Sequence, residues 1–306
     1  MKILLTGASS FTGFHFARAL CAAGHHVVAP LRGKIADYTT GTRAARVKRL
    51  HESADIVEGC SFGSDGFLDL ARSGGWDVLC HHAAHVGDYR SPDYDMLGAV
   101  ASNTHRLREV LGAVGAGTAV VATGSVFEAG EGAGNAPMVA FSPYGLSKGL
   151  TWDIIRHWCL TLGHPFGKFT IPNPFGPYEE PRFGAYLINT WKKGEVAEVR
   201  TPAYVRDNIH VDLLAAAYAG FVAEVAGGRV DARLNPSGYV ETQGAFTLRF
   251  AGEIRRRSNL ACAVKLAEQT DFPEPAVRIN TDRIRPSGWS EVAAWDSVAE
   301  FYGLSS

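Results

Sequence analysis

The sequence predicts an α/β protein built on a doubly wound parallel sheet, followed by a smaller, discontinuous C-terminal lobe. Short apolar runs rich in valine, isoleucine and leucine alternate with segments of helical periodicity up to about residue 170. A glycine-containing turn joins the first of these runs directly to the first helical segment. Strands that are apolar on both faces suit a parallel sheet, and right-handed crossovers place helices on both of its faces.

The elements follow one another in the order of a Rossmann-type domain. Gly24 stands where a helix C-cap glycine belongs, directly before the second strand. After residue 170 the alternation stops, and the prolines and glycines of 171–184 predict an irregular segment, which is usually functional. We expect strands over 2–6, 26–31, 55–57, 77–80, 118–123 and 233–238, helices over 14–24, 67–74, 93–114 and 209–226, a helix beginning near 142, and helix and loop in the remainder.

The composition favours a globular protein that acts on small molecules. Its 306 residues are 46% hydrophobic, and 30 lysines and arginines balance 31 aspartates and glutamates without a long run of either sign. We therefore expect no nucleic-acid partner and no membrane partner. Five scattered cysteines without CxxC spacing favour reduced thiols, and the N-terminus lacks a signal-peptide core, so a cytoplasmic location is expected.

Two clusters of like residues carry weaker signals. His81, His82 and His85 lie close in sequence, but neighbouring residues at a strand end point to opposite faces and no cysteine or carboxylate has suitable spacing. We therefore expect no metal site. The arginines of 255–257 are interpreted as a solvated helix face.

The turn TGASSFTGF (6–14) has the features of a phosphate-binding loop. Free N–H groups at a helix N-terminus satisfy a pyrophosphate if glycines let the backbone approach it. Gly7 and Gly13 are correctly spaced, and Ser10 stands where a middle glycine is usual, so this backbone must suit a residue with a Cβ.

The end of the second strand bears on cofactor choice. NAD sites place a carboxylate there for the ribose hydroxyl, whereas NADP sites use an arginine for the phosphate. Here Arg32 follows Leu31, with Lys34 close behind and no carboxylate nearby. We expect NADP(H) to be preferred, with Arg32 as the phosphate partner and NAD(H) possible as an alternative.

SPYGLSK (142–148) places a phenol and an ammonium four positions apart at the start of a helix. Positions i and i+4 lie on one helix face, so Tyr144 and Lys148 can point into the same space. Such pairs are common in helices, and the rest of the chain must decide whether this one is catalytic.

Three motifs in order resemble the extended short-chain dehydrogenase/reductase family, and most closely its nucleotide-sugar epimerases, dehydratases and ketoreductases. TGxxxxTG follows the first strand, YxxxK the fifth and NPFGP the sixth. The resemblance spans nearly the whole chain and implies a homodimer, often formed in this family through the helix of Tyr144 and Lys148. It also implies a division into a dinucleotide-binding Rossmann domain and a substrate-binding lobe. We assign 1–171 and 204–237 to the domain, and 172–203 and 238–306 to the lobe.

The resemblance also implies roles for individual residues. The catalytic set would be Tyr144, Lys148 and Thr123, with Ser125 as an alternative to Thr123 because Phe127 and Glu128 depart from the family pattern. Asp-Glu after the threonine, usual in dehydratases, is replaced by Gly124 and Ser125. The implied cofactor residues are Gly7, Ser9, Ser10, Phe11, Thr12, Gly13, Arg32, Ala83, Ala84, Tyr144, Lys148 and Pro172, and the implied substrate residues are Asn173, Arg206, Ser125 and Tyr178.

The expected chemistry depends on the pKa of the tyrosine. A free phenol has a pKa of about 10, and nearby positive charge lowers it. We expect Lys148 and an oxidised nicotinamide to lower the pKa of Tyr144, which would then exchange a proton while the cofactor exchanges hydride.

Three functions are compatible with these residues. The first is NADP(H)-dependent reduction of a keto group, with a 4-keto-sugar on a nucleoside diphosphate as substrate. The second is a nucleotide-sugar 4-epimerase with tightly bound NAD(P). The third is a non-catalytic NADP-sensing Rossmann protein, which would not need both Tyr144 and Lys148.

Overall fold

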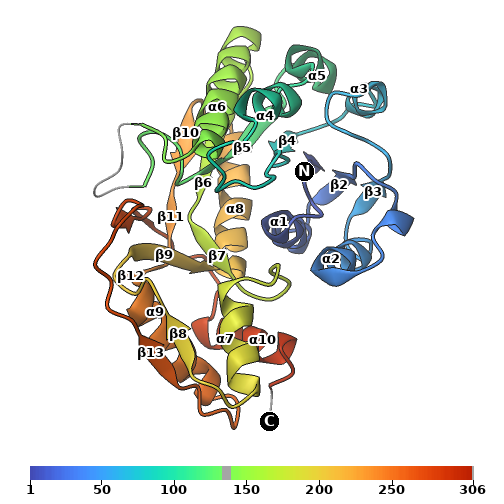
Figure 1. Cartoon of the computed structure of the whole chain (residues 1–306). Coiled ribbons are helices and arrows are strands. Elements are labelled where there is room, and N and C mark those ends of the chain that lie inside the picture. The colour runs from blue at the N-terminus through green and yellow to red at the C-terminus, as the bar shows by residue number, and fades with distance from the viewer. Residues whose placement is uncertain (133–138, 305–306) are drawn as a thin grey trace.

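The centre of the molecule is a seven-stranded sheet with the order β10-β6-β5-β4-β1-β2-β3, and each pair of neighbouring strands is parallel (Figure 1). This computed structural model describes residues 1–132 and 139–304. The strand order reverses around β1, so the crevice at the carboxyl ends of β1 and β4 is where such folds bind ligands. The strands are β1 (Lys2–Leu5), β2 (His26–Pro30), β3 (Asp55–Val57), β4 (Val78–His81), β5 (Ala119–Ser125), β6 (Phe166–Ile171) and β10 (Ala232–Leu234).

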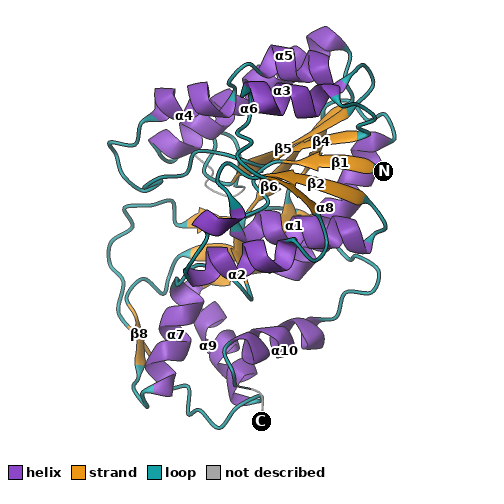
Figure 2. Cartoon of the chain, turned by 90° about the vertical axis from the view of Figure 1, so that its right-hand side faces the viewer, coloured by secondary structure: helices purple, strands orange, loops and turns teal. Residues whose placement is uncertain are grey.

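Helices cover both faces of the sheet, as Figure 2 shows. One layer contains α1 (Phe11–Ala22), α2 (Gly41–Leu50) and α8 (Val211–Ala226), and the other contains α3 (Asp65–Arg72), α4 (Met96–Asn103), α5 (Leu107–Val114) and α6 (Pro143–Leu162). Phe16 on α1 stacks on Tyr218 of α8 with ring centroids 3.9 Å apart. The predicted doubly wound sheet is confirmed.

The smaller lobe has its own sheet and an aromatic core. β9 pairs with β12, β14 and β7. Phe175, Trp191, Phe246, Phe250 and Trp295 are buried together beneath this sheet. The elements are β7 (Asn173–Phe175), α7 (Phe183–Lys192), β8 (Ala197–Val199), β9 (Val205–His210), β11 (Pro236–Ser237), β12 (Tyr239–Thr242), α9 (Gln243–Arg255), β13 (Val264–Leu266), β14 (Val277–Arg278), β15 (Asp282–Arg283) and α10 (Glu291–Phe301).

Several sequence-based expectations were wrong in detail. The helix expected over 93–114 is two helices, because Arg106 adopts a left-handed conformation with φ of +50° between them. The irregular segment expected over 171–184 contains β7, and the helix expected from 209 begins at Val211 because 205–210 is a strand. β12 to β15 lie where helix and loop alone were expected. α2 and α7 were also missed.

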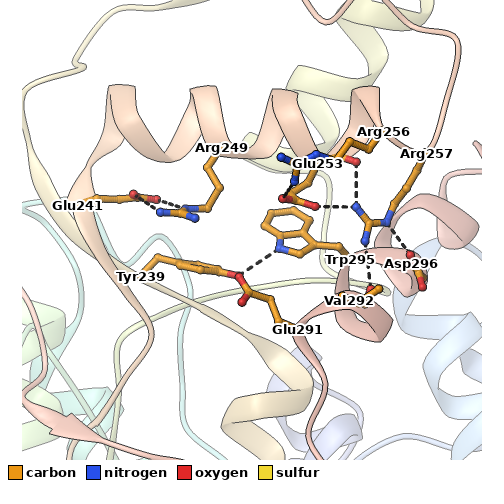
Figure 3. Close-up of polar contacts among 10 residues, drawn as sticks. All are labelled: Tyr239, Glu241, Arg249, Glu253, Arg256, Arg257, Glu291, Val292, Trp295 and Asp296. Carbon is orange, nitrogen blue, oxygen red and sulfur yellow. Dashed lines mark hydrogen bonds and ion pairs between the residues drawn. The ribbon is translucent and has the colours of Figure 1, made fainter.

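The expectation of a solvated helix face over 255–257 holds for Arg255 and Arg256, which are exposed, but not for Arg257. α9 ends at Arg255, and Arg257 donates from Nε to Asp296 of α10 at 2.6 Å and from Nη1 to Glu253 at 2.6 Å (Figure 3). The Arg257 side chain is only 14% exposed. This arginine therefore joins α9 to α10 inside the smaller lobe.

A buried carboxylate joins the smaller lobe to the central sheet. Asp207 on β9 is fully buried and accepts hydrogen bonds from the backbone N–H of Gly238 at 2.7 Å and of Asn280 at 3.1 Å. The Asn280 amide in turn donates to the carbonyl oxygens of Thr170 on β6 and Pro236. Within the described part of the chain, no helix is long and apolar enough to span a bilayer.

We expect Asp207→Ala to lower the free energy of unfolding by about 2–4 kcal/mol, because two buried N–H groups lose a charged acceptor. Urea denaturation measures the change. Asp69→Ala is the matched control: its side chain is 75% exposed and pairs only with Arg72, so a change below about 0.5 kcal/mol is expected. Equal small effects for both variants would contradict the role given to Asp207.

Candidate active site

The turn after β1 lets three backbone segments approach closely. Gly7 has φ of +75°, and a Cβ on it would lie 2.8 Å from the backbone nitrogen of Ala83. A Cβ on Gly13 would lie 2.2 Å from the carbonyl oxygen of Gly7. Ser10 is the N-cap of α1, with φ of −74° and ψ of 168°, and it accepts from the Gly13 N–H. Serine therefore fits where a middle glycine is usual, since its backbone is extended.

The segment after β4 is tied to this turn. Thr6 accepts hydrogen bonds through Oγ1 from the N–H groups of His82 at 3.0 Å and Ala83 at 2.9 Å. Ala83 thus lies beside Gly7, and Ala84 follows it in the chain. This turn, which includes Ser9, Phe11 and Thr12, is where the sequence predicted a dinucleotide to bind.

Helix α6 carries the predicted catalytic pair. Ser142 caps it by accepting from the Gly145 N–H. A Cβ on Gly145 would lie 2.0 Å from the Phe127 carbonyl oxygen, so this glycine lets α6 approach the turn after β5. Tyr144 and Lys148 are one helical turn apart, and neither side chain has a hydrogen-bond partner among the described residues.

Aromatic rings enclose the Tyr144 phenol. The rings of Tyr89 and Tyr94 lie with centroids 5.8 Å from it, and that of Phe127 lies 6.1 Å away. Burial raises the pKa of Tyr144 well above its usual value, the Glu128 carboxylate acts in the same direction, and the Arg182 guanidinium acts against them.

Lys148 is 7% exposed, and burial lowers its pKa. Glu128 opposes this effect, while the nearby charge of Lys168 adds to it. The expected lowering of the Tyr144 pKa by Lys148 is therefore not found in the protein alone, because desolvation outweighs the pair. Both groups are shifted towards their uncharged forms.

A buried charge network lies behind Lys148. Lys168 on β6 donates to Glu128 at 2.6 Å and to Glu131 at 2.7 Å, and all three side chains are at most 5% exposed. A Cβ on Gly124 would lie 2.5 Å from Cε of Lys168, so a glycine is needed there. Glu128 also accepts from the Ser125 N–H at 2.7 Å, which fixes the end of β5.

The two candidate hydroxyls differ in their partners. Thr123 Oγ1 is 2.9 Å from Nδ1 of His82. Ser125 Oγ accepts from the Phe127 N–H at 3.3 Å. Both residues lie on β5 two positions apart, so their side chains share a face of the strand. The structure places both at the carboxyl end of the sheet.

The expected substrate residues are dispersed. Asn173 on β7 pairs in register with Asn208 of β9. Arg206 is 5% exposed and donates to Glu274 at 3.0 Å and to the Pro275 carbonyl at 3.0 Å. Its guanidinium is therefore already engaged by the 274–276 segment.

Tyr178 does not lie beside Tyr144. Its ring packs on Phe14 of α1 and Phe301 of α10 at 5.4 and 4.9 Å, in the junction between the domain and the smaller lobe. Pro172 connects β6 to β7.

Arg32 is exposed after β2 and has no side-chain partner among the described residues. Asp37 is a nearby carboxylate that the sequence analysis missed, and it accepts from the Lys34 N–H at 2.7 Å.

Two side chains near the site were missed as functional candidates. Arg278 is 8% exposed and lies over the rings of Phe127 at 4.2 Å and Phe141 at 5.3 Å. His82 contacts both the turn after β1, through Ser10 and Thr12, and β5, through Thr123. Arg278 lies in a C-terminal segment without clear periodicity, and His82 was considered only as a metal ligand. His81 and His82 do point apart, since His81 contacts the Asn103 carbonyl at 2.9 Å.

A model of the NAD dependent epimerase/dehydratase family matches residues 3–235. A search of curated proteins found no match.

Solved structures with the same fold span the whole chain. A UDP-glucuronic acid 4-epimerase from Bacillus cereus, in complex with UDP-glucuronic acid and NAD, has a TM-score of 0.71 at 18% identity, with 99% of each chain covered. A UDP-N-acetylglucosamine 4-epimerase from Methanobrevibacter ruminantium M1 has a TM-score of 0.74 at 15% identity, with 98% of this chain and 97% of that chain covered. A dTDP-glucose 4,6-dehydratase from Streptomyces venezuelae, with NAD bound, has a TM-score of 0.71 at 19% identity, with 99% and 97% covered. At such identities the likeness establishes the fold.

We expect Lys168→Met to lower the free energy of unfolding by about 3–5 kcal/mol, because two buried carboxylates lose their shared counter-charge. Chemical denaturation measures the change. Lys265→Met is the control, since Lys265 pairs with Glu198 at the surface with side chains 68% and 45% exposed, and about 0–1 kcal/mol is expected. A Lys168 variant as stable as the control would show that the buried network contributes little.

Proposed function

Because this chain belongs to the NAD dependent epimerase/dehydratase family, we propose that it is an NAD(P)-dependent oxidoreductase of a nucleoside-diphosphate sugar. The observation that carries the proposal is the placement of a half-buried phenol and a buried ammonium, Tyr144 and Lys148, on one turn of α6. α6 packs directly against β5, the strand of Thr123.

The residues present fit a dinucleotide. Gly7 and Gly13 let the turn pack closely against the segment after β4 and against itself, and the N-terminus of α1 offers N–H groups to a pyrophosphate. A bound nicotinamide supplies or accepts hydride at the sugar carbon. Tyr144 exchanges the proton of the sugar oxygen, Lys148 supplies positive charge one turn away, and Thr123 or Ser125 donates a hydrogen bond to the same oxygen.

We favour net reduction of a keto group, with a 4-keto-sugar as the substrate. Burial raises the pKa of Tyr144, so the phenol holds its proton at neutral pH and can donate it to a developing alkoxide. Gly124 and Ser125 follow Thr123 where dehydratases carry Asp-Glu, which disfavours dehydration. A 4-epimerase is the second candidate, because two proteins that share the fold are 4-epimerases of UDP-sugars.

One experiment separates these candidates. The purified protein is incubated with NADPH or NADH and a panel of UDP- and dTDP-linked sugars and 4-keto-sugars, while nicotinamide absorbance and the products are followed. Consumption of reduced cofactor supports the reductase, and inversion at C4 without consumption supports the epimerase. Dinucleotide binding without turnover of any sugar would favour the sensor, and absence of binding would overturn the proposal.

We also propose that the chain forms a homodimer. Leu97 on α4 and Leu146 and Leu150 on α6 are 71%, 41% and 37% exposed, and α4 packs on α6. These three leucines support association through the outer face of the two helices.

We expect Tyr144→Phe to lower turnover at least 10²-fold, because the proton donor is removed while the ring is kept. The dissociation constant of NADPH, measured by fluorescence titration, should change by less than about threefold. Tyr186→Phe, on α7 with 43% of the residue exposed, is the control and should retain full turnover. Near-normal turnover of Tyr144→Phe would refute its role.

We propose that Arg32 gives a preference for NADP(H), because it is exposed after β2 and no carboxylate follows it directly. Arg32→Ala should weaken NADPH binding about tenfold and leave NADH binding within about twofold, since only the former has a 2′-phosphate. Titration of both cofactors against wild type, Arg32→Ala and the control Arg256→Ala measures this. Equal effects on both cofactors, or none, would remove Arg32 from the site.

A further inference from the structure

His82 links the phosphate-binding turn to the candidate catalytic hydroxyl. Its Nε2 lies 3.1 Å from Ser10 Oγ and 3.1 Å from Thr12 Oγ1, and its Nδ1 lies 2.9 Å from Thr123 Oγ1. A Cβ on Gly13 would lie 2.8 Å from Cδ2 of the ring, so the glycine also makes room for the imidazole. One side chain thus contacts the N-terminus of α1 and the end of β5.

The imidazole is neutral at physiological pH. Burial lowers the pKa of His82 to about 3, and the charge of Lys148 acts in the same direction. A neutral ring has one N–H donor and one acceptor nitrogen. If Nε2 carries the ring proton, Nδ1 accepts a hydrogen bond from the Thr123 hydroxyl, and the hydroxyl proton cannot be donated to a substrate. If Nδ1 carries the ring proton, Nδ1–H donates to Thr123 Oγ1, and the hydroxyl proton of Thr123 stays available for a substrate.

The two hydroxyls of the turn meet Nε2 in different ways. Ser10 donates its proton to the Gly7 carbonyl at 2.8 Å and accepts from the Gly13 N–H at 3.1 Å, so towards Nε2 it can act only as an acceptor, which requires the proton on Nε2. Thr12 has no other side-chain hydrogen bond among the described residues, so its hydroxyl is free to donate to Nε2, which requires the proton on Nδ1. Only the second tautomer gives the Thr12 proton an acceptor among the described residues, and this favours the proton on Nδ1.

We propose that His82 is a positioning residue that keeps the Thr123 hydroxyl a donor, through Nδ1–H to Thr123 and a hydrogen bond from Thr12 to Nε2. This inference rests on the proposed function, because it concerns how Thr123 meets the sugar oxygen. Without His82 the Thr123 hydroxyl rotates freely, and with the other tautomer it is committed to the ring. Either change weakens stabilisation of the developing alkoxide.

The tautomer can be read without a substrate. In protein labelled with ¹⁵N-histidine and saturated with NADH, the two ring nitrogens of each neutral histidine differ in chemical shift according to which carries the proton. The His82 signals are those lost in His82→Gln. We expect the wild type to show a neutral ring protonated on Nδ1, Thr12→Ser to keep this tautomer, and Thr12→Val, which lacks the donor, to shift it to Nε2. A wild-type ring protonated on Nε2, or no change in Thr12→Val, would overturn the proposal.

Turnover provides a second readout with matched variants. Asparagine places its amide near the position of Nδ1, and glutamine places it near Nε2, so His82→Asn can keep the contact with Thr123 and His82→Gln cannot. We expect turnover to fall about tenfold in His82→Gln and less than about threefold in His82→Asn, with NADH affinity within about threefold in both. His157→Gln, on α6, is the neutral control.

A double-mutant cycle separates positioning from general damage. In a Thr123→Val background, adding His82→Gln should cause no further loss of turnover, because the group through which His82 acts is gone. Full additivity of the two losses would contradict the proposal. Failure of the proposed function would look different: the wild type would bind neither NADPH nor NADH, or Tyr144→Phe would be as active as wild type.

Discussion

The site depends on one geometric constraint, the meeting of the carboxyl ends of β1, β4 and β5 at the same edge of a parallel sheet. Parallel neighbours bring Thr6, His82 and Thr123 together although they are far apart in sequence. The backbones then approach so closely that Thr6 Oγ1 accepts from two successive N–H groups after β4. The glycines at 7 and 13 are a consequence of this approach, because a Cβ at either position would overlap backbone atoms.

Burial, more than pairwise charge, sets the electrostatics around α6. Lys168 donates to both Glu128 and Glu131, and Arg233 lies 3.5 Å from Glu131 as a second positive charge, so each carboxylate of the network has a cationic partner. Lys148 has no such partner within the described chain, and desolvation lowers its pKa. Glu128 has two effects on the site. It fixes the end of β5 by accepting from the Ser125 N–H, and its negative charge raises the pKa of Tyr144. A change in the network would therefore alter both the geometry and the charge of the site.

The sequence predicted what depends on local pattern. Apolar runs located the first five strands of the central sheet within about two residues, and the turn from Gly7 to Gly13 and the phenol–ammonium pair were found from spacing alone. The sequence did not predict features that depend on contacts between residues far apart in the chain. β7 contains Pro174 and follows Pro172, and it is a strand because β9 pairs with it. The hydrogen bond from Arg206 to Glu274, 68 positions away, was likewise not visible in the sequence. His82 was examined for metal binding because sequence proximity to other histidines is visible, whereas proximity to Ser10 and Thr123 is not.

In the proposed reaction, the desolvation of Tyr144 favours one direction of proton transfer. A phenol whose pKa is raised keeps its proton at neutral pH, and it can give that proton to an oxygen that gains charge as hydride arrives at the adjacent carbon. The reverse reaction, oxidation of a sugar hydroxyl, needs the phenolate, which burial and Glu128 both disfavour. The positive charge of an oxidised nicotinamide would add to that of Lys148 in stabilising the phenolate, whereas a reduced nicotinamide carries no such charge. In the proposed reaction, Tyr144 of the protein alone would therefore act as an acid, and it would act as a base when an oxidised nicotinamide is bound. An epimerase needs both states in each cycle, while a reductase needs only the first.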